Sequence, residues 1–468
     1  MDHIYDFLGK LENQSKMHRI LRFLLLTVCF SFVMPNRVYI HPFGLFALEN
    51  VSCQTVKAQS EKPLKTVKLM HIDPHNAEPK SHTQTNTKSG RQSVTQHISV
   101  LSSLQNSLGL RLYQAIKKTT NSLFSPTNAF ETLVTFYFGA SKETAANLQQ
   151  FLGLAKETDK EGCISLFDGH RVLQMLKDIR SMTEMTEDEF KTVAWIFVSN
   201  NTDLSEDFVQ GIHDFSDTSY IQAVDFSQPP EAEAQVNSFI QQTSSRKIKH
   251  LFKDISPTSD LLFASSIHFK GNWGTTQPDM ASLEEFWINE KTSIKVPLMT
   301  QTGNFKYLND KGRKCMVLKL PLNKRTYMLL VLPHEGAHLD HIEAILTADV
   351  ISIWHQYLKE GLLKVSLPQF SINTVNDLKD ILSHMKLPDL LGRGANFQRL
   401  SSKDRLNINQ VLITMAFEMS GDGSENQYTT QDSGPVLKLT VNRPFMFTII
   451  EGNSDAILLL GRITNPVQ

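Results

Sequence analysis

The sequence predicts one large α+β domain preceded by an N-terminal arm. Apolar residues recur at helical spacing over residues 98–116, which predicts a long first helix. Short apolar runs bounded by turn residues follow, as is typical of buried strands; they cover residues 261–264, 317–320, 327–332 and 456–460. Neither an internal repeat nor a Pro/Gly-rich break divides this part of the chain. We therefore expect a single α+β domain over residues 97–468.

Composition supports a folded protein and disfavours two classes of partner. The chain has 468 residues and is 41% hydrophobic, which is enough for a sizeable core. Lys plus Arg number 47 against 48 Asp plus Glu, so the net charge is -1. A nucleic-acid or anionic-membrane surface normally requires a clear excess of positive charge. We expect no nucleic-acid partner and no membrane partner.

Residues 1–35 are predicted to be an N-terminal extension and a secretory signal. A basic stretch at residues 17–22 precedes an apolar run at residues 23–34, which is the pattern of a signal peptide. The run is shorter than the about 20 residues that span a bilayer. Met17 is an alternative start, and Pro35 is not the small residue usual before the cut. Sequons at Asn50 and Asn200 also fit a secreted, extracellular glycoprotein.

Residues 46–96 are predicted to be a tail and linker. From Gln54 to Gln96 the chain has no Phe, Trp or Tyr, and polar residues dominate, so this stretch has little apolar surface to bury. His71, His75 and His82 lie within it, but no Cys or acidic residue is spaced to complete a metal site. We interpret them as solvated and predict no metal.

Several blocks of the domain resemble the serpin family in sequence and order. They are NSLFSP at 121–126, SIHFKG at 266–271, VPLM at 296–299, LLVLP at 329–333, NRPFMF at 442–447 and GRITNP at 461–466. The resemblance covers residues 98–468 and implies a large central mixed sheet, further sheets and surrounding helices. The terminal blocks also predict core positions without it, because Phe445 and Phe447 alternate onto one face and Gly461 permits a close-packed bend.

Serpin resemblance alone does not define a function, since one fold can inhibit proteases, carry hormones or do neither. An enzyme is not predicted, because the sequence lacks a Gly-rich phosphate loop, a metal-ligand cluster and a nucleophile elbow. We therefore expect no catalytic residue and no cofactor.

The loop after residue 419 argues against protease inhibition. In inhibitory serpins this loop inserts into a sheet and requires small, uncharged residues at alternate positions. Here Asp422, Glu425 and Asp432 are charged, and Gly421 and Gly423 weaken any strand that they enter. Burying an unpaired carboxylate costs several kcal/mol. We expect an exposed polar loop and a non-inhibitory serpin.

The string NRVYIHPFGLF at residues 36–46 resembles the angiotensin family of vasoactive peptides. The resemblance implies that residues 36–45 form the first released peptide and residues 36–43 the receptor-binding octapeptide, in which Asn36 replaces the usual Asp. The receptor-binding peptide comprises Asn36, Arg37, Val38, Tyr39, Ile40, His41, Pro42 and Phe43. Its expected receptor handles are the cation of Arg37, the rings of Tyr39, His41 and Phe43, and the new terminal carboxylate. The alternative is that Val38, Tyr39, Ile40 and Phe43 form a first β-strand docked on the domain.

The same resemblance implies two cuts. A renin-type aspartic protease would cut between Leu45 and Phe46, whose bulky apolar side chains suit adjoining subsites. A converting enzyme would then cut between Phe43 and Gly44, and the His41–Pro42 imide would stop further trimming. We expect Pro42 to push His41 toward extended geometry, which lowers the entropy lost on entering the cleft of such a protease. The released octapeptide would act on an angiotensin receptor.

Three cysteines follow the signal, which itself contains Cys29, so one of them has no partner within the chain. The resemblance implies a disulfide between Cys53 and Cys163, leaving Cys315 as a buried or idle thiol. Such a bridge would tether the scissile segment and is expected to influence access to it. A glycan on Asn50 would lie close enough to Phe46 to slow docking of a protease.

The sequence therefore predicts a secreted precursor of an angiotensin-like vasoconstrictor hormone that regulates blood pressure and fluid balance. Two alternatives remain open at this stage, namely a serpin protease inhibitor and a carrier of an apolar hormone.

Overall fold

The structure is a computed structural model that divides into two compact units, Met1–Leu45 and Phe46–Gln468. The described residues are 42–47, 63–72, 91–116, 118, 120–155, 167–186, 188–244, 247–274, 283–385, 389–403, 405–421 and 436–467. Of the first unit, only residues 42–45 are described. The second unit contains the remaining described elements.

Helices of the second unit begin at residues that satisfy free main-chain N–H groups. Ser125, Asp168, Ser205, Thr347 and Asp377 each accept a hydrogen bond from the first turn of the helix that follows. The described helices are α2 Pro42–Phe46, α4 Arg91–Ala115, α5 Pro126–Gly139, α6 Lys142–Phe151, α7 Gly169–Ser181, α8 Glu206–Phe215, α9 Pro229–Thr243, α10 Leu339–Ala344, α11 Ala348–Tyr357 and α12 Leu378–His384. None of them is long and apolar enough to cross a membrane.

The described strands form three sheets. A nine-stranded sheet has the order β14-β11-β8-β9-β10-β15-β16-β2, with β7 paired to β8; a five-stranded sheet has the order β12-β13-β6-β3-β5; and β1 pairs with β4. The strands are β1 Thr66–Val67, β2 Ser122–Phe124, β3 Phe190–Ser199, β4 Leu204–Ser205, β5 Thr218–Val224, β6 Leu261–Trp273, β7 Leu283–Asn289, β8 Thr292–Asp310, β9 Cys315–Pro321, β10 Thr326–Pro333, β11 Lys359–Pro368, β12 Phe370–Asp377, β13 Ile408–Gly421, β14 Leu437–Thr440, β15 Phe445–Glu451 and β16 Ile457–Ile463.

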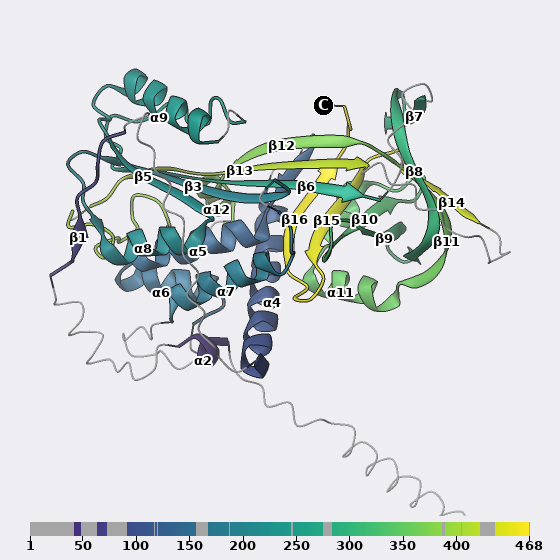
Figure 1. The fold of residues 1–468 in the computed structure, drawn as a ribbon, viewed down its shortest axis with the longest axis horizontal. Helices are drawn as coiled ribbons and strands as arrows, with labels where there is room; N and C mark the ends of the chain where they lie inside the picture. The colour runs from purple at the N-terminus through teal and green to yellow at the C-terminus, as the bar shows by residue number, and fades with distance from the viewer. Residues whose placement is uncertain are drawn as a thin grey trace, which may run out of the picture. The chain divides into compact units, whose positions relative to one another are not determined.

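Helices cover both faces of the five-stranded sheet (Figure 1), with α9 on one face and α5, α7 and α8 on the other. On the α9 face, Trp195 of β3 belongs to one buried apolar cluster with Phe239 of α9. On the opposite face, Phe136 of α5 lies 5.4 Å from Phe263 of β6, measured between ring centroids. Residues 193–198 of β3 and 261–264 of β6 are buried on both faces, and both stretches are continuous apolar runs.

The α+β class and the predicted elements are confirmed. The four predicted apolar runs lie mainly within β6, β9, β10 and β16, and the first long helix is α4, which begins at Arg91 rather than near residue 98. Phe445 and Phe447 are fully buried and both contact the ring of Phe370. A Cβ atom on Gly461 would lie 2.6 Å from the carbonyl oxygen of Ser122, so the close approach expected there is present.

Residues 63–72 lie within the stretch expected to be a linker, yet they pair with the domain. Thr66 and Val67 pair with β4, and Met70 accepts a 2.8 Å hydrogen bond from the main-chain nitrogen of Ala223. Ile72 is only 8% exposed and joins the cluster beneath α9. Main-chain pairing requires no aromatic side chain, and one buried isoleucine anchors the segment, so low aromatic content was a poor guide here. We call residues 63–72 the strap.

Candidate functional site

Helix α2 carries the predicted scissile pair, Leu45 and Phe46. It begins at Pro42, whose fixed φ and missing N–H suit the first helical position. Residues 36–41 lie outside the described residues, so the structure does not place the first part of the predicted hormone. Leu45 is of intermediate exposure. The boundary between the two compact units coincides with the predicted scissile bond.

Phe46 is fixed on the domain through both its side chain and its main chain. The side chain is 0% exposed, and its ring packs edge-on against the imidazole of His97, with centroids 5.5 Å apart. Its carbonyl oxygen accepts a 2.6 Å hydrogen bond from the main-chain nitrogen of Asp168, and the next residue, Ala47, forms an antiparallel bridge with Phe167. We call these five residues the Phe46 anchor.

Helix α4, helix α7 and the N-cap residue before α7 position the Phe46 anchor. His97 lies in the first turns of α4, and its Nε2 atom is 3.1 Å from Nη2 of Arg171 in α7. Asp168 is the N-cap of α7, and its carboxylate accepts a 3.0 Å hydrogen bond from the main-chain nitrogen of Arg171. The N-cap hydrogen bond therefore fixes Asp168, and the main-chain nitrogen of Asp168 in turn holds Phe46.

The base of the anchor is aromatic and buried. The ring of Phe167 stacks on that of Tyr137 in α5, with centroids 4.1 Å apart. Burial raises the pKa of the Tyr137 hydroxyl to about 12, so this group stays neutral at physiological pH. Apolar packing therefore fixes Phe167 while its main chain pairs with Ala47.

Residues 42–46 form a short helix, and His41, which Pro42 is expected to hold in extended geometry, lies outside the described residues. Burial of the Phe46 ring and pairing of its carbonyl oxygen stabilise this helical turn. A protease that binds an extended substrate requires α2 to unwind and Phe46 to leave the anchor.

His97, Asp168 and Arg171 were not identified as site residues from the sequence. The only local signal was Asp168 ahead of an amphipathic helix, which predicts an N-cap and not a contact with the arm. His97 is one of 16 histidines and carries no motif of its own. Their role depends on contacts between distant parts of the chain.

Cys53, Cys163 and Asn50 lie outside the described residues. The Ala47–Phe167 bridge nevertheless brings together main-chain positions that lie within a few residues of both cysteines. Cys315 in β9 is a buried free thiol, and desolvation raises its pKa to about 12. The expectation of a buried thiol is confirmed. Asn200 is exposed in the turn after β3.

The sheet next to the predicted loop is closed. β13 ends at Gly421, and Asp422, Glu425 and Asp432 lie outside the described residues. From Val411 paired with Phe263 to Gly421 paired with Trp273, β13 and β6 form a parallel ladder, so they are direct neighbours. A strand can enter between them only if this ladder breaks.

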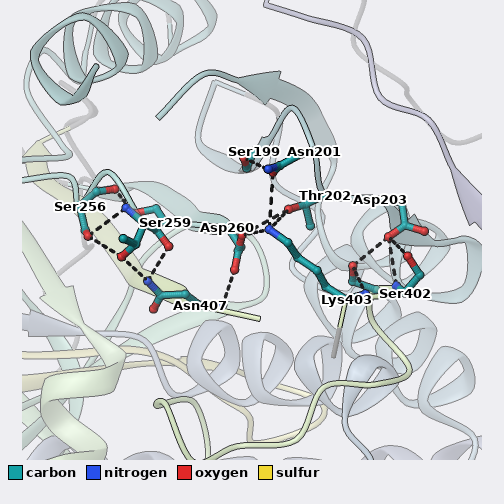
Figure 2. A network of polar contacts seen from close by, with 12 residues as sticks. Ser199, Asn201, Thr202, Asp203, Ser256, Ser259, Asp260, Ser402, Lys403 and Asn407 are labelled. Carbon is teal, nitrogen blue, oxygen red and sulfur yellow. Dashed lines mark hydrogen bonds and ion pairs between the residues drawn. The ribbon is translucent and has the colours of Figure 1, made fainter. Parts of the chain in front are cut away.

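Polar contacts hold the same two strands together at their start (Figure 2). Asp260, just before β6, pairs with the ammonium group of Lys403 and accepts a 2.8 Å hydrogen bond from the main-chain nitrogen of Asn407, just before β13. The Asn407 side-chain amide also donates to the carbonyl oxygen of Thr258 at 2.8 Å. Asp260 is only 8% exposed, so opening the sheet here would expose its carboxylate to solvent.

No group of three or more His, Cys, Asp or Glu side chains among the described residues could hold a metal ion. The arrangement described above instead combines a buried Phe46, next to the predicted scissile bond, with a closed sheet.

A family model described as serpin (serine protease inhibitor) matches residues 103–466. The chain belongs to the serpin family, and the predicted serpin fold is confirmed. Serpins are not catalysts, so the chain is not an enzyme.

Among individual relatives, the chain resembles angiotensinogens over nearly its whole length. It is 30% identical to angiotensinogen of Bos taurus, over 92% of this chain and 94% of that one. Its identity to angiotensinogen of Homo sapiens is 28%, over the same shares. The crystal structure of mouse protein-Z dependent protease inhibitor matches with a TM-score of 0.68 and 25% identity, over 80% of this chain and 99% of that one. This chain is therefore an angiotensinogen-like serpin.

Proposed function

We propose that this serpin is a secreted, non-inhibitory precursor of an angiotensin-like vasoactive peptide. A renin-type aspartic protease cuts between Leu45 and Phe46 and releases residues 36–45. A converting enzyme then removes Gly44 and Leu45, and the octapeptide Asn36 to Phe43 acts on an angiotensin receptor. Through that receptor the peptide raises vascular tone and regulates blood pressure and fluid balance.

The main support for the proposal is a hormone-like string in a chain that resembles angiotensinogen over nearly its whole length. The string NRVYIHPFGLF stands at residues 36–46 of a chain that resembles angiotensinogen over 92% of its length. Similarity that extends through the arm, beyond the serpin domain at residues 103–466, supports a function located in the arm. The basic and apolar stretches before residue 36 support export into plasma.

The closed sheet supports the non-inhibitory part of the proposal. Insertion of the loop would break the β6–β13 ladder and bury carboxylates at Asp422, Glu425 and Asp432, each at a cost of several kcal/mol. Protease inhibitors do occur among the relatives, so this part needs its own test.

The Phe46 anchor makes cleavage a two-step process in this proposal. Phe46 ends a helical turn and is buried, so the protease acts on the fraction of molecules in which Phe46 has left the anchor. A disulfide between Cys53 and Cys163 and a glycan on Asn50 would both act on that step, because they flank the anchor in sequence.

Mass spectrometry after incubation with a renin-type protease tests the proposal. The expected products are a peptide ending at Leu45 and one new N-terminus at Phe46. Leu45→Asp removes an apolar subsite residue and should abolish this cut, whereas the matched variant Leu45→Met should retain it. Cleavage elsewhere in the arm, or equal cleavage of the two variants, would refute the proposed scissile bond.

A further inference from the structure

The start of α7 is connected to Phe46 by two routes. The main-chain nitrogen of Asp168 donates a 2.6 Å hydrogen bond to the carbonyl oxygen of Phe46. Separately, Nη2 of Arg171 lies 3.1 Å from Nε2 of His97. The imidazole of His97 in turn packs edge-on against the Phe46 ring. The geometry of one helical turn therefore affects both the main chain and the side chain of Phe46.

The Asp168 carboxylate controls the geometry of this turn. It accepts a 3.0 Å hydrogen bond from the main-chain nitrogen of Arg171, which is the N-cap hydrogen bond of α7. Asp168 itself has extended backbone, with φ -78° and ψ 90°, and the cap holds it in that conformation. The side chain of Asp168 thus acts on the main chain of α7, and the main-chain nitrogen of the same residue acts on Phe46.

The rest of α7 is fixed by contacts that do not involve the cap. Leu173 is 0% exposed. A Cβ atom on Gly169 would lie 2.9 Å from the ring of Phe138, so α5 packs closely against the α7 backbone there. Nδ1 of His170 lies 2.7 Å from Oδ2 of Asp214 in α8. Loss of the cap should therefore loosen the first turn of α7 and leave the body of the helix in place.

We propose that Asp168 is a positioning residue for the Leu45–Phe46 bond. By capping α7, its carboxylate sets the fraction of molecules in which Phe46 has left the anchor. Asp168 touches no reacting atom and acts through its own main-chain nitrogen. The inference rests on the proposed function and names a control of the same bond. It places this control in the serpin domain, outside the hormone sequence.

The expected size follows from the strength of helix caps. Replacing an Asp N-cap by Ala weakens a helix start by a factor of about 2 to 30, which corresponds to about 0.5–2 kcal/mol. Part of this loss reaches Phe46, so the open fraction should rise about three- to tenfold. A protease that binds only the open form then shows a KM that is lower by the same factor, with kcat unchanged. Asn and Ser cap helices about as well as Asp, so they should preserve the closed anchor.

Steady-state cleavage of the full chain by a renin-type protease is the first test. Asp168→Ala should lower KM about three- to tenfold and leave kcat unchanged. Asp168→Asn and Asp168→Ser keep a cap oxygen and remove the charge, so their KM should stay within about twofold of wild type. Thr347→Ala is the matched control, because Thr347 caps α11 by accepting a 3.2 Å hydrogen bond from the main-chain nitrogen of Val350. It removes a cap elsewhere in the domain and should leave KM unchanged.

Three results would refute the positioning role. They are a wild-type KM for Asp168→Ala, a lowered KM for the Asn and Ser variants, and an equal fall of KM in Thr347→Ala. The second result would mean that charge acts in place of capping, and the third that general destabilisation does. Asp168→Val provides another variant without a cap if Asp168→Ala does not fold, and thermal unfolding identifies any global loss of structure.

Hydrogen–deuterium exchange tests the same inference without a protease. Exchange of residues 42–47 should accelerate in Asp168→Ala and remain as in wild type in Asp168→Asn and Thr347→Ala. If exchange follows this order while no cut occurs between Leu45 and Phe46, the positioning role stands and the proposed function fails. If the bond is cut while exchange is the same in all variants, the proposed function stands and the positioning role fails.

Discussion

The carbonyl oxygen of Phe46 accepts a 2.6 Å hydrogen bond from the main-chain nitrogen of Asp168, a residue 122 positions away in sequence (168 minus 46). That hydrogen bond and the buried Phe46 ring place the carboxyl side of the predicted scissile bond in the domain. In the proposed function, release of the peptide therefore requires a local opening, and this opening can be measured separately from cleavage.

Two buried phenylalanines should behave differently when truncated. Phe46→Ala removes an anchor that can open without unfolding the domain, so the free energy of unfolding should fall by at most about 2 kcal/mol, while exchange of residues 42–47 accelerates. Phe136→Ala removes a ring that contacts Phe208, Phe263 and Phe397 in the core and should cost about 3–5 kcal/mol. Urea unfolding and hydrogen exchange distinguish the two, and equal losses would mean that the arm is part of the cooperative core.

The bridge between Cys53 and Cys163 is predicted to slow opening of the anchor. Cross-linking positions 110 residues apart (163 minus 53) contributes on the order of 4–5 kcal/mol in the chain-entropy model, part of which favours the closed Phe46 anchor. Peptide mapping without reductant should recover the linked pair. Cys53→Ser should accelerate exchange of residues 42–47 and alter the cleavage rate, whereas Cys315→Ser should do neither. Identical cleavage of Cys53→Ser and wild type would remove the bridge from the control of release.

A glycan on Asn50 should hinder the protease, because it would lie four residues beyond Phe46 (50 minus 46). We expect Asn50→Gln to be cut faster than the glycosylated wild type. Asn200→Gln is the matched control, since Asn200 is exposed in a turn after β3 and carries a sequon far from Phe46 in sequence. If enzymatic removal of both glycans leaves the rate unchanged, the Asn50 glycan plays no part.

Elements whose determinants are local were predictable from the sequence. The apolar run at residues 327–332 lies within β10, and the run at 456–460 lies largely within β16. Both were predictable because apolar residues and flanking turn residues mark a buried strand in the local sequence. Gly461 was expected at a close-packed bend; it lies within β16, where the carbonyl oxygen of Ser122 approaches it closely.

The candidate site was predictable only in part. The string at residues 36–46 predicts a scissile pair, but the placement of Phe46 depends on His97 and Asp168, which no local pattern connects to it. The strap was missed for a similar reason, because the site that buries Ile72 is built by β3, β5 and α9. Tertiary contacts of this kind override local propensity, and they cannot be recognised from a single sequence.

The thiol of Cys315 should be almost inert in the folded protein. Desolvation, with a smaller contribution from Asp310, raises its pKa to about 12, so at pH 8 roughly one thiol in ten thousand is ionised. Alkylation by iodoacetamide should be very slow in the native state and fast in urea. The raised pKa also means that Cys315 favours folding below the thiol pKa of the unfolded chain, and that this contribution declines as the pH rises above it. Rapid native alkylation at Cys315 would contradict the burial.

Cleavage of the loop between β13 and β14 should leave the sheet closed. Insertion requires that the β6–β13 ladder separates and that Asp422, Glu425 and Asp432 enter or border a strand, which costs several kcal/mol for each carboxylate that becomes buried. After nicking within residues 422–435, the thermal midpoint should shift by less than about 2 °C, and serine proteases should form no SDS-stable complex with the chain.

Replacing the three carboxylates by Ala tests whether charge alone prevents insertion. If the triple variant also fails to gain stability on nicking, the contacts at Asp260 and the β6–β13 ladder are the larger barrier. A large rise in the midpoint of nicked wild type, or a stable complex, would show that the sheet opens and would place this chain with the inhibitory serpins.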